Sequence, residues 1–354
     1  NKTILTGQGK QRVLFQSTNF TNKTKSVWDG FVIQDGVSSS DNEKNGIGAY
    51  LKDYSALVNC EIKNNVALHS YSRGIGIYME NAVHSTLENC LIHHNESGKN
   101  ENGRYFGNVR GSAIFFNAGG QVVNSTIVDN TTVDGNTVEL LIYDNVTFTN
   151  SIIVANRRIG QDGSIYPLSN FNLYGNPLHF VHCAVDGGTN GFSSFPISKS
   201  DLNADYSLTQ YSSCVDAGIE ISHFSDLDIT GNKRTQSKRI DIGAIESSWT
   251  STITPSKNNI IYVSEKGKKN GSGSSWEDAT CMLQAAVNSA LLTKADVYVA
   301  AGTYKGDTLD KNAFTMLSGV KVYGGFAGTE KSPSERNLKK NKSILTGQGK
   351  QRVL

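Results

Sequence analysis

Two arginines and a group of aromatic residues are the side chains whose types and spacing best suit ligand binding. Arg73 and Arg110 each precede a glycine that opens a similar stretch, "GIGIYM" in one case and "GSAIFF" in the other. The loops that lead into them also carry Tyr71, Arg104 and Tyr105. Aromatic rings beside guanidinium groups suit the binding of sugars and acidic glycans. We expect a ligand, if there is one, at these five residues; the alternative is a solvated turn with a long variable loop.

The carboxylates and histidines do not form a catalytic pattern. A polygalacturonase-type hydrolase needs clustered aspartates on one strand face, and a calcium-dependent lyase needs aspartates stacked on adjacent coils beside a basic residue. Asp29 aligns with Val, Glu or Thr in the equivalent repeats described below, and Asp35 and Asp129 share a place but lie several repeats apart. His93 and His94 have no converging ligands, so we expect turn residues there. We therefore expect no catalysis, no cofactor and no metal.

A long repeat joins the two ends of the sequence. The stretch "KTILTGQGKQRVL" spans 2–14, and "KSILTGQGKQRVL" spans 342–354, at an offset of 342 − 2 = 340 residues. They differ only at Thr3 and Ser343. We interpret the chain as a window, one module wide plus an overlap, from a longer tandem array. Neighbouring copies of the module, joined head to tail in a filament, are then the expected partners.

A shorter repeat fills the middle of the chain. Its copies are "WDGFVIQDG" from Trp28, "LVNCEIKNN" from Leu57, "LENCLIHHN" from Leu87, "VVNSTIVDN" from Val122, "FTNSIIVAN" from Phe148 and "FVHCAVDGG" from Phe180. They start 29, 30, 35, 26 and 32 residues apart. The third place holds Asn59, Asn89, Asn124 and Asn150, and the sixth holds Ile62, Ile92, Ile127 and Ile153.

This spacing predicts an all-β fold, a right-handed parallel β-helix (a solenoid). Places four and six lie two residues apart and face one side of a strand, whereas place one breaks the alternation, so the chain bends at place three. Asparagine tolerates the left-handed conformation of such a bend, and stacked asparagines can bond from coil to coil in an asparagine ladder. Interior ladders are expected for the isoleucines and for Tyr50, Tyr78 and Phe115.

Composition excludes several other classes of protein. Of the 354 residues, 37% are hydrophobic and 19% charged, and 35 are glycines, which suits short strands and turns. The net charge of +2 indicates neither nucleic-acid nor anionic-membrane binding, and no apolar run is long enough for membrane insertion.

The five cysteines include no CxxC pair. Cys60 and Cys90 share a place in adjacent coils, where parallel side chains favour buried thiols over a disulfide.

The repeat pattern fades after Gly188, and we expect three segments. Residues 1–246 would form the coils and the C-terminal end of one module, 247–259 a Ser/Thr-rich linker, and 260–354 the cap and first coils of the next copy. Ser275 and Asp278 have the spacing of a capping box. The residues after them predict a helix with Leu283, Val287 and Leu291 on one face, a short N-terminal capping helix that covers an open edge.

Several motifs carry a family resemblance. They include "YVSEKGKKNGSGSSWEDAT", "VYVAAGTY", "VYGGFAGTE", "ILTGQG", the "NCxI" coils, "CVDAG" and "DITGNKR" followed by "IDIGAIE". Together these resemble the large secreted right-handed parallel β-helix proteins of Bacteroidetes-type bacteria, which often carry pectate-lyase-like labels. The resemblance covers nearly the whole chain in permuted order, and it implies an extracellular or cell-surface location in a bacterium.

The expected function is that of a structural or adhesive module of a giant extracellular repeat protein, without catalysis. One alternative is a polysaccharide lyase or glycoside hydrolase that acts on acidic glycans. The other is a carbohydrate-binding module. A parallel β-helix hosts all three, so fold alone does not separate them.

Overall fold

The computed structural model describes residues 2–17, 23–38, 40, 44–166, 179–186, 194–195, 197–210, 212–222, 224–234, 239–306, 313–314, 316–349 and 352–353. Two compact units result: unit 1 is Asn1–Ala184, Glu220–Arg234 and Ile242–Glu246, and unit 2 is Val185–Ile219, Thr235–Asp241 and Ser247–Leu354. The expected first segment ended at residue 246. In the structure, 185–219 and 235–241 belong to unit 2 instead. The sheets are mostly parallel, and the described residues contain one α-helix, which is too short and polar to cross a membrane.

The first sheet of unit 1 carries the isoleucine ladder. Its parallel strands follow the order β1-β4-β7-β11-β14-β17-β21. Their bounds are Thr3–Thr6, Phe31–Gln34, Glu61–Lys63, Leu91–His93, Thr126–Val128, Ile152–Val154 and Cys183–Val185. The residues in direct register are Leu5, Ile33, Ile62, Ile92, Ile127 and Ile153. The five isoleucines are fully buried, so this row forms a core face of the sheet.

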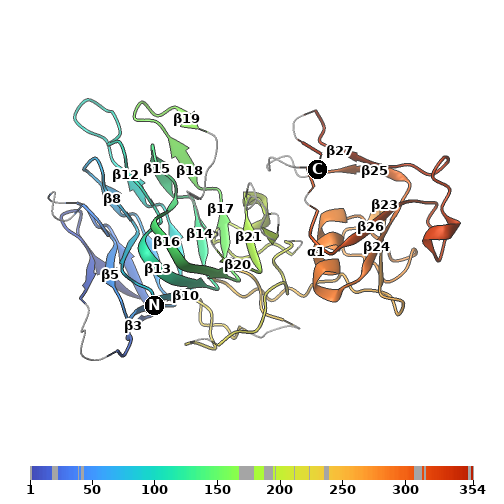
Figure 1. The fold of residues 1–354 in the computed structure, drawn as a ribbon, viewed down its shortest axis with the longest axis horizontal. Helices are drawn as coiled ribbons and strands as arrows, with labels where there is room; N and C mark the ends of the chain where they lie inside the picture. The colour runs from blue at the N-terminus through green and yellow to red at the C-terminus, as the bar shows by residue number, and fades with distance from the viewer. Residues whose placement is uncertain are drawn as a thin grey trace. The chain divides into compact units, whose positions relative to one another are not determined.

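Two further rows of strands merge into one sheet, in the order β2-β5-β9-β13-β10-β6-β3, with β16 beside β13 and β20 beside β16. Their bounds are Leu14–Gln16, Ala49–Lys52, Ile77–Glu80, Ile114–Val123, Thr86–Glu88, Ser55–Val58, Ser26–Asp29, Val138–Thr149 and His179–Val181. The long strand β13 pairs with β9 through its first half and with β10 through its second half. Its register against β16 shifts between Ala118 and Gly120, so the chain turns there without leaving the sheet. Figure 1 shows these strands side by side.

A fourth row, of short parallel strands, follows the order β8-β12-β15-β18, with β19 antiparallel at its end. Their bounds are Val66–Ala67, Glu96–Ser97, Thr131–Val133, Arg157–Ile159 and Ile165–Tyr166. All four rows advance by one strand for each copy of the short repeat. Residues at the same place in successive copies of the repeat are therefore the residues that pair in the sheets.

Asparagines line two bends in each of the four middle copies of the short repeat. At the third place, Asn59, Asn89, Asn124 and Asn150 have φ of 52°, 52°, 46° and 48°, which confirms the expected left-handed conformation. Their side-chain ladder has gaps. Asn89 Nδ2 donates to Asn59 Oδ1 at 3.0 Å, and Asn150 Nδ2 donates to Asn124 Oδ1 at 3.0 Å. Asn89 Oδ1 and Asn124 Nδ2 have no hydrogen-bond partner among the described residues.

The continuous ladder forms at the ninth place of the repeat, which holds Asn65, Asn95, Asn130 and Asn156, whereas the sequence pattern predicted it at the third place. Asn65, Asn95 and Asn130 each donate Nδ2 to the Oδ1 of the next asparagine, ending at Asn156, over 2.8, 2.9 and 3.0 Å. Each acceptor oxygen also receives the backbone N–H of the preceding asparagine. All four side chains are buried, so these bonds satisfy polar groups that water cannot reach.

The buried cysteines lie in the same stack. Cys60 and Cys90 are free thiols, and each Sγ lies 3.4 Å from a backbone carbonyl of the preceding repeat. Burial raises the pKa of Cys60 to about 11 and the pKa of Cys90 well above its usual value. Both side chains therefore remain neutral and pack as small apolar groups.

Unit 2 contains a three-stranded parallel sheet, β23-β24-β26, a strand pair β25-β27, and helix α1. The strand bounds are Ile260–Lys268, Asp296–Ala300, Lys321–Phe326, Gly302–Lys305 and Ser343–Thr346, and α1 spans Leu283–Thr293. Shorter elements are β22 (Ser194–Phe195) and the 3-10 helices η2 (Lys199–Asp201) and η3 (Pro333–Glu335). As expected, Leu283 and Val287 of α1 are buried against the sheet, and Leu291 is partly buried there. Figure 1 shows α1 next to β24 and β26.

The expected capping box at the start of α1 is wrong. The Asp278 N–H does donate to Ser275 Oγ at 3.2 Å, but α1 begins after Met282, which makes no side-chain cap. Thr280 pairs instead with strand β23, so an extended segment separates the turn from the helix. The carboxylate of Asp278 stabilises the loop before it, by accepting the Ser272 N–H at 3.0 Å.

Candidate functional site

Four aromatic rings stack in a row across strands β2, β5, β9 and β13. Phe15, Tyr50, Tyr78 and Phe115 are in direct register, with successive ring centroids 5.3, 4.9 and 5.3 Å apart. Arginines border the row. We call the surface formed by Arg12, Phe15, Tyr50, Arg73, Tyr78, Arg110 and Phe115 the arginine–aromatic face.

Burial of the aromatic row varies along its length: Tyr78 and Phe115 are buried, as expected for interior positions, whereas Tyr50 is half-buried. Leu51, Met79 and Phe116 are the next residues along these strands, and all three are fully buried. Because successive side chains of a strand point to opposite faces, the aromatic row lies on the face away from this core. Its rings grade from Phe115, which is buried, to Phe15, which is 53% exposed.

Arg73 and Arg110 are adjacent, as their alignment predicts. The two residues form a parallel bridge, and Arg73 forms another with Asn45. The Arg73 guanidinium lies 5.3 Å from the Phe115 ring centroid, a cation–π distance. The Arg110 Nη1 lies 3.7 Å from a carboxylate oxygen of Glu139. Each arginine is therefore positioned by a neighbouring side chain, Arg73 by Phe115 and Arg110 by Glu139, and Arg110 remains exposed.

Arg12 and Phe15 complete this face, and the sequence reading missed both. The Arg12 guanidinium lies 5.0 Å from the Tyr50 ring centroid and 5.7 Å from that of Phe15, and its Nη2 donates to the Asn45 carbonyl at 2.9 Å. The sequence did carry a signal for Phe15. This residue stands between Leu14 and Gln16 in "LFQ", much as the aromatic residues of the later repeats stand inside "AYL", "IYM" and "IFF". Because both residues belong to or follow the long repeat, they were not aligned with the short one.

Carboxylates balance the charge of this face. Glu80 lies 3.3 Å from Lys52 Nζ. Burial and the charge of Glu80, which also accepts a hydrogen bond from the phenol, raise the pKa of Tyr50. The Tyr50 hydroxyl is therefore a neutral donor. The exposed ring of Phe15, the half-buried ring of Tyr50 with its phenol, and the guanidinium groups are groups of the kind that recognise sugars.

The other three predicted ligand residues contact residues outside the arginine–aromatic face. Tyr71 is 65% exposed, and its N–H donates to the Gly107 carbonyl at 3.1 Å. Tyr105 pairs with Lys99, whose Nζ lies 4.7 Å from the Tyr105 ring centroid. Arg104 is exposed on the same loop and interacts electrostatically with Asp162. The structure thus brings Arg73 and Arg110 together and gives Arg104 and Tyr105 a different set of neighbours.

Of the two histidines expected in a turn, only His94 has a turn conformation. His93 ends strand β11 and is buried, with Nε2 3.0 Å from Glu61 Oε1 and Nδ1 2.7 Å from the His94 Nδ1. His94 does have the left-handed conformation of a turn, at φ 53°. Across the described residues, no group of three or more His, Cys, Asp or Glu side chains is placed to hold a metal ion.

The two copies of the long repeat form a second notable feature. Strands β1 and β27 are followed by the same turn: Gln8 and Gln348 have φ of 53° and 56°, and each N–H donates to the preceding threonine Oγ1 at 3.0 Å. Gly9 and Gly349 follow with φ of 65° and 70°. The repeated sequence therefore adopts one local structure in both units.

The two copies are bonded along opposite edges. In the first copy, the Gly7 N–H donates to the Gln34 carbonyl at 3.1 Å, so the odd-numbered residues of β1 face β4. In the second copy, the Lys342 and Thr346 carbonyls accept the N–H groups of Gly302 and Gly306, at 2.9 and 3.3 Å. The even-numbered residues of β27 therefore face β25. Within the described residues, β1 and β27 each have one partner strand.

No family model, curated protein or solved structure matches this chain. Function is therefore inferred from the chain's own residues and contacts.

Proposed function

We propose that this chain is a structural or adhesive module of an extracellular, tandem-repeat filament protein of the bacterial surface, and that it is not an enzyme. Its modules would join head to tail through the long repeat. The observation that carries this proposal is the opposite-edge bonding of β1 and β27. One strand sequence is used twice, and the edge left open in each copy is the edge occupied in the other.

We infer that the rows of unit 1 are faces of a right-handed parallel β-helix. Equivalent places about 30 residues apart pair in direct register along three rows, which is what coils of one winding require. Crossovers between parallel strands are right-handed in nearly all proteins, which favours that hand.

The junction between modules follows from the shared strand. If β27 of one module occupies the place that β1 has in the next, its even-numbered residues bond β25 and its odd-numbered residues bond the next β4. Leu345 would then join the ladder that begins at Leu5 and Ile33. Leu5 and Leu345 are only half-buried in the structure, so the junction would remove apolar surface and two open strand edges from water.

A strand-replacement experiment tests the junction. Removal of residues 1–14 opens the edge of β4, and a peptide of residues 342–354 should fill it as well as a peptide of residues 2–14 does. We expect either peptide to raise the melting temperature of the shortened chain. Without a peptide, the shortened chain should associate head to tail, which sedimentation velocity detects.

Proline variants of the peptide give the matched control. Leu345→Pro removes an N–H that would face β4 and should abolish the effect, whereas Ile344→Pro removes one that faces away and should retain most of it. A 342–354 peptide that has no effect, in parallel with an active 2–14 peptide, would refute the junction.

Binding of acidic glycans is a second candidate function, favoured by the arginine–aromatic face. It is compatible with an adhesive module, since a repeated sugar site increases avidity along an array. The enzymatic alternative has a direct test: release of unsaturated sugars from pectate by the purified chain, lost on changing a single Asp or Lys, would overturn the non-catalytic proposal.

A further inference from the structure

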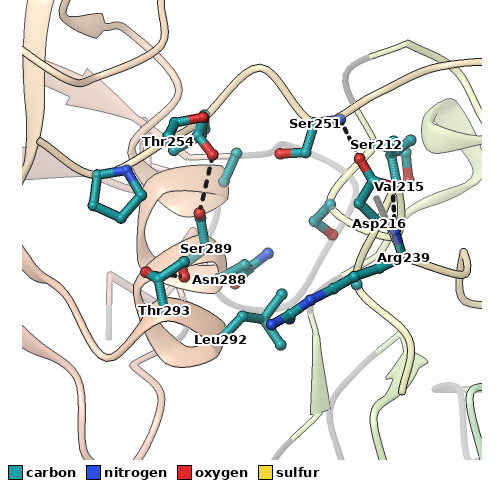
Figure 2. Close-up of a pocket in the computed structure, with 15 residues that line it drawn as sticks. Ser212, Val215, Asp216, Arg239, Ser251, Thr254, Asn288, Ser289, Leu292 and Thr293 are labelled. Atoms are coloured by element: carbon teal, nitrogen blue, oxygen red, sulfur yellow. Dashed lines mark hydrogen bonds between the residues drawn. The ribbon is translucent and has the colours of Figure 1, made fainter. Parts of the chain in front are cut away.

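A cavity of about 260 Å³ lies within unit 2. Its walls are the segments 212–217, 251–255 and 285–293, together with Arg239. Figure 2 shows α1 on one side and the Asp216 loop on the other. The wall is held in place by Asp216, whose Oδ2 accepts the Ser251 N–H at 2.6 Å, and by Ser289, whose Oγ donates to the Ile253 carbonyl at 3.4 Å.

One buried amide faces this cavity without a partner. Asn288 is 2% exposed, and its Oδ1 accepts a hydrogen bond from Gln284 Nε2 at 3.1 Å. In this orientation of the two amides, the other atom of the Asn288 amide is Nδ2, a donor, which has no hydrogen-bond partner among the described residues. Figure 2 shows this nitrogen directed into the cavity. A buried donor left unpaired is costly, so its persistence at a cavity wall points to a ligand acceptor.

The other groups around the cavity also favour an acceptor with negative charge. Arg239 extends across it toward Leu292 of α1 (Figure 2). The one carboxylate in the wall, Asp216, already accepts the N–H groups of Ser251 and Arg239, at 2.6 and 3.3 Å. Hydroxyl groups, among them Thr254, and apolar side chains complete the lining. Donors on one side, a guanidinium on the other and apolar walls between them match a small ring that carries a carboxylate.

We propose that this cavity binds a single carboxylated sugar of the uronic acid type. Its carboxylate accepts from Asn288 Nδ2 and lies near the Arg239 guanidinium, and its ring packs against the apolar wall. The site is separate from the arginine–aromatic face, which belongs to unit 1, and it does not depend on the joining of modules.

Titration of the full chain with sodium D-galacturonate tests the site, with D-galactose as the neutral control. The readout is the side-chain amide NMR signal of Asn288, identified by its loss in Asn288→Leu. We expect saturable shifts of this signal with galacturonate and at least about tenfold weaker binding of galactose, the ratio lost with one charge-assisted hydrogen bond. Added salt should weaken galacturonate binding because it screens the Arg239 charge.

Variants separate a binding role from a structural one. Asn288→Leu should weaken galacturonate binding about tenfold with little change in melting temperature, because it removes one unpaired donor and one acceptor, that of the half-buried Gln284 amide, which water can replace. Asn288→Asp should abolish binding by placing a second negative charge opposite the ligand. Arg239→Gln should reduce the preference for the acid, whereas Lys321→Gln, an equal charge change outside the cavity lining, should not. Absence of shifts, equal shifts with galactose, or unchanged binding by Asn288→Leu would each refute the proposal and leave a cavity that holds water only.

Discussion

The amide of Gly7 donates to the carbonyl of Gln34 at 3.1 Å, whereas Gly347, its counterpart in the second copy, has its N–H on the side of β27 away from β25. One strand sequence thus has two bonding edges, and each unit uses a different one. A strand with both edges available can pair with one strand on each side, so the edge left open in each copy is free to bond a further strand.

The first prediction compares proline at equivalent places of the two copies. Ile4→Pro removes an N–H on the open edge of β1, and the Ile4 side chain is 57% exposed, so the unfolding free energy should change by less than about 1 kcal/mol. Ile344→Pro removes an N–H that faces β25 and should cost about 3 kcal/mol. Chemical denaturation of both variants measures the difference. Equal losses would contradict the edge assignment.

The isoleucine ladder gives the second prediction. Ile92 is fully buried between Ile62 and Ile127, so Ile92→Asp places a carboxylate where nothing solvates it. We expect a loss of about 4 kcal/mol in unfolding free energy, or failure to fold. Ile92→Val, which only shortens the side chain, should cost about 1 kcal/mol. A melting temperature within a degree or two of the parent for Ile92→Asp would show that the register is wrong.

The two asparagine ladders should differ in their contribution to stability. Asn130→Ala deprives Asn95 of an acceptor for both its side-chain and its backbone N–H, at 2.9 and 3.1 Å, and should cost about 3 kcal/mol. Asn124→Gly keeps the positive φ and removes one acceptor instead of two, that of Asn150 Nδ2 at 3.0 Å, so it should cost about 1 kcal/mol. Urea denaturation compares them, and the reverse order would count against the ladder assignment.

Stability should fall in acid through Glu61. A hydrogen bond from His93, together with Lys63 at 2.8 Å, lowers the pKa of Glu61 from its usual 4.5 to about 2. Because the folded-state pKa is the lower one, this stabilisation is complete above pH 4.5 and is lost as the pH falls toward 2. With allowance for screening by water, the loss is about 1 to 2 kcal/mol.

The matched control for Glu61 is Glu61→Gln, which cannot titrate. Unfolding free energies at pH 6 and at pH 3 should differ more in the parent than in this variant. Identical pH dependence in the two proteins would contradict the role of the Glu61 carboxylate.

The arginine–aromatic face yields the last prediction. Arg110 is exposed, so Arg110→Ala should weaken retention on immobilised acidic glycans severalfold while unfolding changes by less than about 1 kcal/mol. Arg73→Ala should also reduce stability by about 1 kcal/mol, because it loses the cation–π contact with Phe115. Salt should weaken retention of the parent. Retention that survives replacement of both arginines would exclude this face as the glycan site.

The sequence by itself determined the repeat, the register and the bends. Ile62, Ile92, Ile127 and Ile153 stack as their alignment indicates, since a period of two within a strand and a fixed offset between coils leave one compatible pairing. The left-handed asparagines follow from local sterics, which depend on the residue and its neighbours alone.

Only the tertiary structure decided which face the aromatic row takes, which asparagine ladder is continuous, which edge each copy of the long repeat leaves open, and that Asn288 lacks a partner. The aromatic spacing fits either side of a strand until the burial of Leu51, Met79 and Phe116 is known. Hydrogen-bond partners and cavities depend on groups that are distant in the sequence. Asn288 and Asp216 line the same cavity although more than 70 residues separate them in the chain, and no local sequence pattern encodes this proximity. Local sterics act within a few residues and can be read in order along the chain, whereas pairing and burial are properties of the packed whole.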